Sequence, residues 1–221
     1  NTTANNNVAV GYNSLTANST GTTNVGIGTA ALAANTTASN NTAVGHGVLE
    51  SNTTGTQNTA VGSLALDANT TADSNTAIGY SSLGANSTGA NNTGLGHSSL
   101  FNNTTASNNT AVGSSALFAN TTGTENVAVG TNALDANTTA SYNTGVGWNV
   151  LSANTTGITN TAVGRGSLAS NTTADSNTGL GSQTLASNTT GASNTAVGRD
   201  ALTANTTGAA STAVGFQSLN S

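Results

Sequence analysis

The chain has no cysteine, proline, methionine or lysine, and only 4% of its 221 residues are charged. The absence of cysteine excludes disulfide bonds and thiolate metal sites. No run of about 18 apolar residues occurs, so the sequence predicts no membrane span. The only arginines are Arg165 and Arg199, and the formal net charge is −5. This balance argues against binding to nucleic acid or to an anionic membrane.

What the chain does contain is a repeat of 17 residues without insertion or deletion. Its commonest opening is Asn-Thr-Ala-Val-Gly, as in Asn41–Gly45, and coil positions are numbered from that Asn. Low charge with abundant Asn, Thr, Ser, Ala and Gly is also typical of disordered chains. Disorder does not require a Leu at the ninth position of every repeat, however, so the strict period favours a folded array.

The period predicts an all-β fold, a parallel β-solenoid (β-roll or β-helix) with 17 residues per coil and about 13 coils. A helix–turn–helix repeat needs more than about 30 residues, and Val, Ile and Thr favour extended chain. We expect strands at positions 1–4, 7–10 and 12–14, with corners at the position 5 glycine and at positions 15–17. Residues 1–221 are then a single repeat array, and we expect it to be a segment of a longer fibrous protein.

Invariant positions are expected to point inward or to hold the backbone. Position 4 is aliphatic, position 9 is Leu, and positions 5, 12 and 14 are Gly, Asn and Thr. In two representative coils this structural ladder consists of Val44, Gly45, Leu49, Asn52, Thr54, Val112, Gly113, Leu117, Asn120 and Thr122. Stacked Asn side chains at positions 1 and 12 can form amide ladders. The alternative is that Asn-Thr-Thr serves as a glycosylation acceptor.

Position 15 alternates between Ala and Gly along most of the chain. The residue after Ala is Asn, Ser or Asp, as at Ser39 and Asp73, and its side-chain oxygen can cap a turn. Two kinds of corner therefore alternate, which predicts a genetic unit of two coils.

The motif Asn-Thr-Ala-Val-Gly-x-x-x-Leu, as in Asn41–Leu49, resembles the repeat of YadA-type trimeric adhesin heads, whose coils carry a similar small–Ile/Val–Gly core motif. Those coils are usually shorter, and the extra residues here fall around Asn-Thr-Thr. The full 17-residue form is similar to repeats in bacteriophage tail-fibre proteins and large bacterial surface proteins. The resemblance covers the whole chain. It implies a left-handed β-roll and a homotrimer.

Residues capable of catalysis or metal binding are sparse. His46 and His97 share position 6 but lie three coils apart, about 14 Å by strand spacing, which is too far to share a metal ion. Glu50 and Asp67 share position 10 in neighbouring coils, and a carboxylate pair can do acid–base work. No insertion forms a cleft around them, so we expect no enzyme activity, no cofactor and no metal site.

Two surface features remain. Aromatic residues occupy position 6 every fourth coil, at Tyr12, Tyr80, Trp148 and Phe216, and are candidates for contact with a sugar or a partner. Ala, Gly or Ser fills most of positions 3, 8 and 11. Since neighbouring strand residues point to opposite sides, we expect some of these small residues to line a smooth outer face that packs on an identical rod.

These features predict a structural or adhesive segment of an extracellular fibre, stalk or surface filament, on a cell or a virion. We expect it to be non-catalytic and self-associating, as a homotrimer or filament, with surface glycans or a host surface as further partners. The alternative is ice binding through stacked Thr ranks. Position 13 offers one outward rank, from Thr36 to Thr206, whereas Thr at position 14 is expected to point the other way.

Overall fold

A computed structural model, which describes residues 3–220, confirms an all-β parallel solenoid with one strand per 17-residue repeat. The chain divides into two compact units, residues 1–108 and 109–221, which are described in turn. No helix occurs among the described residues. Within residues 3–220, therefore, nothing forms a helix long and apolar enough to cross a membrane.

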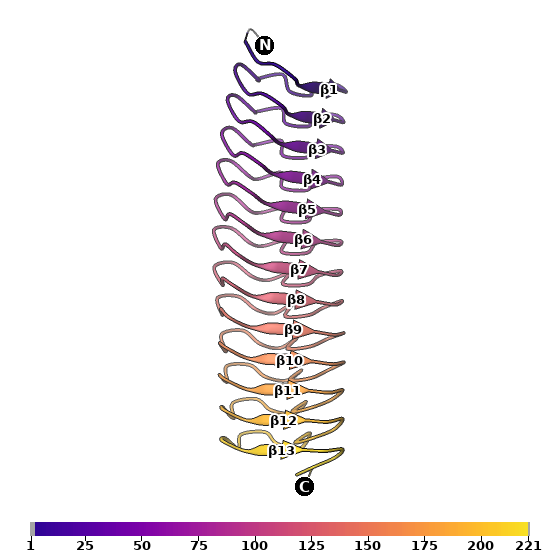
Figure 1. The fold of residues 1–221 in the computed structure, drawn as a ribbon, viewed down its shortest axis with the longest axis vertical. Coiled ribbons are helices and arrows are strands. Elements are labelled where there is room, and N and C mark those ends of the chain that lie inside the picture. Colours follow the sequence, from indigo (N-terminus) through magenta and orange to yellow (C-terminus); the bar gives the residue numbers. More distant parts are fainter. Residues whose placement is uncertain (1–2, 221) are drawn as a thin grey trace. The chain divides into compact units, whose positions relative to one another are not determined.

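Within the first unit neighbouring strands pair in parallel, with no slip in register (Figure 1). Thr42, for example, lies beside Thr59, and Val44 beside Val61. The strands of this unit are β1 (Val8–Val10), β2 (Val25–Ile27), β3 (Thr42–Val44), β4 (Thr59–Val61), β5 (Thr76–Ile78) and β6 (Thr93–Leu95).

The second unit repeats this arrangement, and its neighbouring strands also pair in parallel and in register. The strands of this unit are β7 (Thr110–Val112), β8 (Val127–Val129), β9 (Thr144–Val146), β10 (Thr161–Val163), β11 (Thr178–Leu180), β12 (Thr195–Val197) and β13 (Thr212–Val214).

The strand occupies positions 2–4, and its middle residue is the one that points inward. Ala43 and Ala111 are fully buried, whereas Val44 and Val112 are only half-buried. The prediction that the position 4 aliphatic residues form the core was therefore wrong. Residues two apart on a strand share a face, so positions 2 and 4 both face outward once position 3 faces in.

The interior is too narrow for a branched side chain at position 3. A Cβ added to Gly26 would lie 2.7 Å from Ser14 Oγ and 3.3 Å from Leu15 Cγ. Opposite the strand, the core is filled by the position 9 leucines, with Leu49 and Leu117 both 0% exposed. Position 8 is also buried in nearly every coil. The small residues at positions 3 and 8 thus line the core, so neither position contributes to the outer packing face predicted for some of the small residues, and only position 11 remains for it.

The strands predicted at positions 7–10 and 12–14 are absent from the described coils, and turns and bends take their place. Their backbone is not extended, because positions 7 and 9 have positive φ, 62° at Gly47 and 49° at Leu49. The coils remain hydrogen-bonded there, since Leu49 N–H donates to Ala65 O at 3.1 Å. The left-handed backbone conformation is costly for an L-amino acid such as leucine. Burial of the Leu49 side chain offsets that cost.

Glycine at position 5 is required by both conformation and space. Gly45 and Gly113 have φ of 139° and 132°, a region that residues with a Cβ rarely adopt. A Cβ on Gly62 would lie 2.6 Å from the carbonyl oxygen of Gly79 in the next coil. This corner therefore stacks only when it carries no side chain.

The amide ladder predicted at position 12 is present. Asn52 Nδ2 donates to Asn35 Oδ1 at 3.1 Å, and Asn69 Nδ2 donates to Asn52 Oδ1 at 2.8 Å. Asn52 Nδ2 also donates to Gly55 O at 2.9 Å, which closes the corner of its own coil. Asn52 and Asn120 are both 0% exposed. A glycan cannot be attached to an amide buried in this way, so the fold disfavours the glycosylation alternative.

A second rank of asparagines, at position 1, connects each coil to the next. Asn41 Oδ1 accepts the backbone N–H of Asn58 at 2.9 Å, and Asn41 Nδ2 donates to Gly55 O at 2.9 Å. The carbonyl at position 15 therefore receives amide hydrogens from both ranks. These buried polar groups satisfy one another, except at Asn177, whose buried Nδ2 has no hydrogen-bond partner within the described residues.

We expect Asn52→Ala to destabilise the fold by about 1–3 kcal/mol, because it leaves the Asn35 and Asn69 amides and the Gly55 carbonyl short of a partner. The measurement is the midpoint of urea unfolding. The matched control is Thr54→Ala, two residues away on the surface, which should change stability by less than about 0.5 kcal/mol. Equal midpoints for the two variants would contradict a stabilising role for the ladder.

The alternation at position 15 has a structural counterpart at position 16. Ser39 Oγ accepts the backbone N–H of Thr22 at 2.9 Å, and Asp73 Oδ1 accepts that of Thr56 at 2.6 Å. In each case the residue that follows Ala caps the backbone of the preceding Gly-type coil. The corner is therefore completed by pairs of coils, as the alternating sequence predicts.

Candidate functional site

The outward side of the strands forms the first candidate surface, which we name the strand face. It consists of the side chains at positions 2 and 4 in every coil. In the first unit these are Val8, Val10, Val25, Ile27, Thr42, Val44, Thr59, Val61, Thr76, Ile78, Thr93 and Leu95. In the second unit they are Thr110, Val112, Val127, Val129, Thr144, Val146, Thr161, Val163, Thr178, Leu180, Thr195, Val197, Thr212 and Val214.

The strand face has no charged residue, and its position 4 rank is apolar throughout. Ile78 and Leu95, which pair across β5 and β6, are 39% and 42% exposed. In the second unit Val163 and Leu180 are 39% and 38% exposed. Single exposed aliphatic residues are ordinary, but a contiguous row of exposed apolar side chains is typical of a surface that contacts a protein or a ligand.

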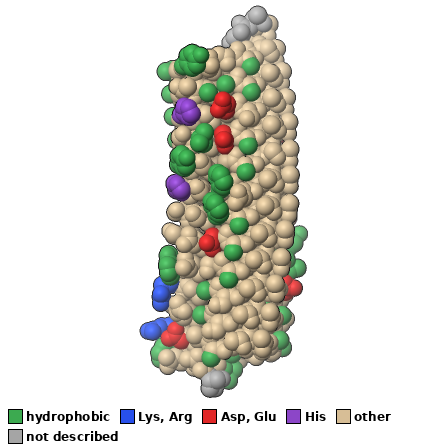
Figure 2. All heavy atoms as spheres, turned by 180° about the vertical axis from the view of Figure 1, so that it is seen from behind, with side chains coloured by type: hydrophobic (Ala, Val, Ile, Leu, Met, Phe, Trp, Pro, Cys, Tyr) green, Lys and Arg blue, Asp and Glu red, His purple; other side chains and the backbone are tan. Residues whose placement is uncertain are grey.

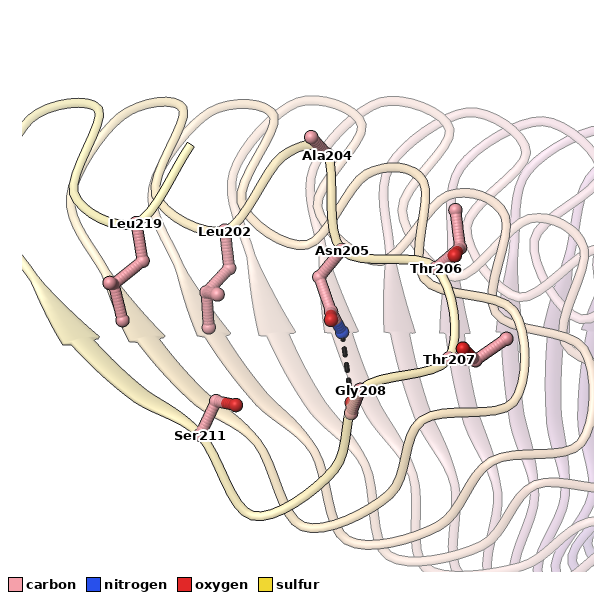
Figure 3. Close-up of a pocket in the computed structure, with 8 residues that line it drawn as sticks. All are labelled: Leu202, Ala204, Asn205, Thr206, Thr207, Gly208, Ser211 and Leu219. Atoms are coloured by element: carbon pink, nitrogen blue, oxygen red, sulfur yellow. Dashed lines mark hydrogen bonds between the residues drawn. The ribbon is translucent and has the colours of Figure 1, made fainter. Parts of the chain in front are cut away.

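The Thr corner, positions 13 and 14, forms the second candidate surface. Thr53 Oγ1 donates to Thr70 O of the next coil at 3.0 Å, and Thr121 Oγ1 donates to Thr138 O at 3.0 Å. The position 13 hydroxyls are thus engaged by the backbone. Figure 3 shows Thr206 and Thr207 on this corner, away from Leu202.

Position 14 differs from the prediction. Thr54 and Thr122 are exposed rather than turned inward, as are the threonines at position 14 in every other coil. Within the described residues their hydroxyls have no hydrogen-bond partner. The chain bends between positions 13 and 14 instead of continuing as a strand, so the alternation of sides expected for a strand does not apply.

The four position 6 aromatics are all at the surface, with 75%, 52%, 50% and 64% exposure for Tyr12, Tyr80, Trp148 and Phe216 respectively. Their surroundings differ. Tyr80 stacks on His97 with ring centroids 5.4 Å apart, and the Arg199 guanidinium lies 5.7 Å from the centroid of the Phe216 ring. They are therefore not four copies of one site.

A depression of about 310 Å³ lies beside Tyr80, within the first unit. It is lined by Leu64, Asp67, Tyr80, Ser81, Gly84, Ala85 and Phe101, which come from three successive coils. Charged side chains are few on the face of the molecule that Figure 2 shows. A depression that combines two aromatic rings with a carboxylate is thus unusual for this chain.

Two aspartates at position 10 have unusual electrostatics. Burial raises the pKa of Asp67, opposed by backbone hydrogen bonds at Asp67 and Ala68, and the charge of Glu50 raises it further. Burial also raises the pKa of Asp135, again opposed by hydrogen bonds from its own and the following backbone N–H. The charge of Glu50 thus acts on the Asp67 carboxyl of the next coil, as the smallest of these causes. Within the described residues, no cleft that could enclose a substrate surrounds these two carboxylates.

Two further searches of the described residues give no candidate for a functional site. No group of three or more His, Asp or Glu side chains in residues 3–220 could hold a metal ion. A hollow of about 400 Å³ is lined by residues from Leu202 to Leu219, and in it Asn205 Nδ2 donates to Gly208 O at 3.0 Å (Figure 3). Leu202, Asn205, Gly208 and Ser211 stand at coil positions that are buried in the preceding coil, so this hollow is a coil interior rather than a separate site.

Comparison with known proteins does not add to this picture, since no family model, curated protein or solved structure matches the chain.

Sequence reasoning identified Tyr80, Trp148 and Asp67, but it did not connect Asp67 with Tyr80 and did not single out Asp135. Asp67 precedes Tyr80 by 13 residues, and Asp135 precedes Trp148 by the same interval (80 − 67 = 148 − 135). With a 17-residue coil, that interval places position 10 of one coil near position 6 of the next. The signal was present in the spacing, but it has meaning only once the coil is known to bring these two positions together.

Proposed function

We propose that this chain is a non-catalytic structural segment of an extracellular fibre, stalk or surface filament, in which identical chains associate through the strand face. The observation that supports the proposal is the uncharged strand face itself, with aliphatic side chains about 40% exposed at Ile78 and Leu95. Burial of such a surface stabilises an assembly by roughly 25 cal/mol per Å² of apolar area.

A second copy of the chain is the occupant that fits this face best. Its ranks repeat with the strand spacing of about 4.8 Å, so an identical face offers side chains at the same intervals. Neither face carries a charge that would be desolvated or repelled on contact. A trimer is the proposed state, on the likeness of the repeat to YadA-type adhesin heads, and the cell or virion surface is the proposed location.

We expect Ile78→Lys combined with Leu95→Lys to convert the oligomer to a monomer, because two ammonium groups would be buried without partners in the interface. Sedimentation velocity at micromolar concentration measures the change. The coil itself should remain folded by circular dichroism, since both side chains face outward.

The control places the same substitutions at the Thr corner of the same two coils, as Thr88→Lys with Thr105→Lys. Both threonines are exposed. This variant should sediment like the unaltered chain. A wild-type chain that remains monomeric, or a loss of association in the control alone, would rule out the strand face as the interface.

Ice binding is the second candidate, and one observation favours it: the exposed position 14 hydroxyls, which have no partner within the described residues. These hydroxyls repeat once per coil and are free to order water. The position 13 rank does not add a second free rank, because hydroxyls such as that of Thr53 donate to the backbone.

The same two variants separate the candidates in a thermal-hysteresis assay. If the Thr corner binds ice, the unaltered chain shows hysteresis, the Thr88/Thr105 variant loses it, and the Ile78/Leu95 variant retains it. A structural fibre segment shows no hysteresis in any of the three.

A further inference from the structure

The depression beside Tyr80 is shaped by a substitution found once in the array. Phe101 lies over Gly84, and a Cβ added to Gly84 would come within 3.1 Å of Phe101 Cε2. Gly84 is the only glycine at position 10 of any coil. The missing side chain thus lets the Phe101 ring settle against the backbone of the coil before it, where it forms one wall of the depression.

Tyr80 supplies a second aromatic wall. One face of its ring is taken by His97, one coil further on, at an interplanar angle of 16°. The other face is therefore turned toward the preceding coil, which carries Leu64 and Asp67 at the same depression. Tyr80 as a whole is 52% exposed, and it borders the depression on this side.

The depression carries the carboxylate of Asp67. Asp67 is half-buried, and the negative charge of Glu50 lies close enough to raise its pKa. Neither Arg residue of the chain lies within residues 1–108, and lysine is absent. No arginine or lysine of the same unit is therefore available to neutralise these carboxylates.

We propose that Tyr80, Phe101 and Asp67 form a binding site for an alkylammonium group, either the side chain of a lysine or a quaternary ammonium such as choline. A cation is attracted to the faces of aromatic rings, and the Asp67 carboxylate supplies the opposite charge. The methylene or methyl groups of the ligand fit the apolar walls made by Leu64 and Ala85. This site is distinct from the strand face and does not depend on self-association.

The second unit carries a simpler version of the same pair. Trp148 and Asp135 stand at the coil positions of Tyr80 and Asp67. Asp135 Oδ1 is buried and has no hydrogen-bond partner within the described residues. Ser152 and Ala169 replace Gly84 and Phe101, so the second aromatic wall is missing. We expect this site to bind the same ligands more weakly.

Phe216 provides an internal control, since it is an aromatic residue at the same coil position. Thr203 stands where an aspartate would be, and the Arg199 guanidinium lies 5.7 Å from the ring centroid. The carboxylate is absent, and a cation of the chain itself already lies over the ring. An alkylammonium ligand should therefore not bind at Phe216.

A neutral sugar is the competing ligand, because a pyranose ring can also stack on an aromatic face. It would leave the charge of the half-buried Asp67 uncompensated, with the charge of the exposed Glu50 close by. An alkylammonium group satisfies both the rings and the charge, which is why we favour it.

The test is a proton NMR titration of the full chain with choline, with Nα-acetyl-lysine amide and with methyl β-glucoside. The Tyr80 ring resonances report the first site, and the indole N–H of Trp148, the only tryptophan, reports the second. We expect both cations to shift the Tyr80 resonances and the glucoside to leave them unchanged. Comparison of the two cations shows whether a lysine side chain or a quaternary group is the better ligand.

Three variants make the assignment specific. Asp67→Asn, which keeps the shape of the side chain, should weaken cation binding at Tyr80 by about tenfold, a loss of about 1.4 kcal/mol. Gly84→Ala should also weaken it, because the Phe101 ring must move. Phe216→Ala should have no effect. Circular dichroism checks that each variant is folded.

Three outcomes would overturn the proposal: no shift at Tyr80 with either cation, tighter binding of the glucoside than of the cations, or unchanged affinity in Asp67→Asn. Equal cation-induced shifts at Phe216 and Tyr80 would likewise show that any exposed aromatic ring attracts the ligand and that Asp67 and Phe101 form no specific site.

Discussion

Replacing Gly62 with alanine is expected to destabilise the chain by about 2–6 kcal/mol, the sum of backbone strain and overpacking. Gly62 has φ of 124°, and its added Cβ would lie 2.6 Å from the carbonyl oxygen of Gly79. Neither atom can move aside, because the carbonyl belongs to the next corner and each corner stacks on another. The midpoint of urea unfolding measures the effect, and hydrogen exchange around β4 and β5 locates it.

The matched control is Gly47→Ala, in the preceding coil. Gly47 also has positive φ, 62°, but its added Cβ would meet only the flexible tips of Leu64 and Glu50, at 3.0 and 3.3 Å. Ala30 occupies the same coil position with φ of 59°. This variant should cost only about 1 kcal/mol. If both variants unfold at the same urea concentration, close stacking at position 5 is not what requires glycine there.

Replacing Leu117 with alanine is expected to cost about 2–5 kcal/mol, the usual range for a buried leucine. Leu117 is 0% exposed and occupies position 9 in the array. Its φ of 52° is equally unfavourable for leucine and alanine, so the backbone contribution cancels and the loss reports packing. The measurement is again the unfolding midpoint, in urea or by heating.

Val112→Ala, in the strand of the same coil, is the comparison that decides which side chains form the core. Val112 is half-buried and faces outward, so its truncation should cost about 1 kcal/mol. Ser114→Ala, on the exposed turn, should be neutral within about 0.5 kcal/mol. A loss at Val112 as large as that at Leu117 would restore the sequence-based assignment of position 4 to the core.

The architecture could be predicted because it is encoded locally and repeated. A gapless period, with glycine at position 5 and leucine at position 9 of every coil, allows only an array in which each coil stacks on the next. The Asn ladders follow from the same logic, since a buried amide repeated at every coil needs its neighbour as a partner. The capping role of Ser39 and Asp73 was also visible in the alternation at position 15.

The direction in which each side chain points could not be predicted in the same way. Val44 is larger and more apolar than Ala43, so hydrophobicity alone places Val44 inside. In the structure Ala43 points inward instead, because Leu49 already fills the interior and the facing strand has room only for a methyl group or a hydrogen. The left-handed backbone at Leu49 was equally hidden, since leucine normally avoids that conformation.

The sequence by itself determined the repeat, the fold class and the residues that hold one coil on another, because those contacts recur at a constant interval along the chain. Only the tertiary structure decided which surfaces are available for function. It turned the aliphatic rank outward, and it brought Asp67 beside Tyr80 and Phe101, residues from three successive coils. Side chains on different coils become neighbours through the closure of the coil and the narrowness of its interior. Neither property is visible in any one repeat.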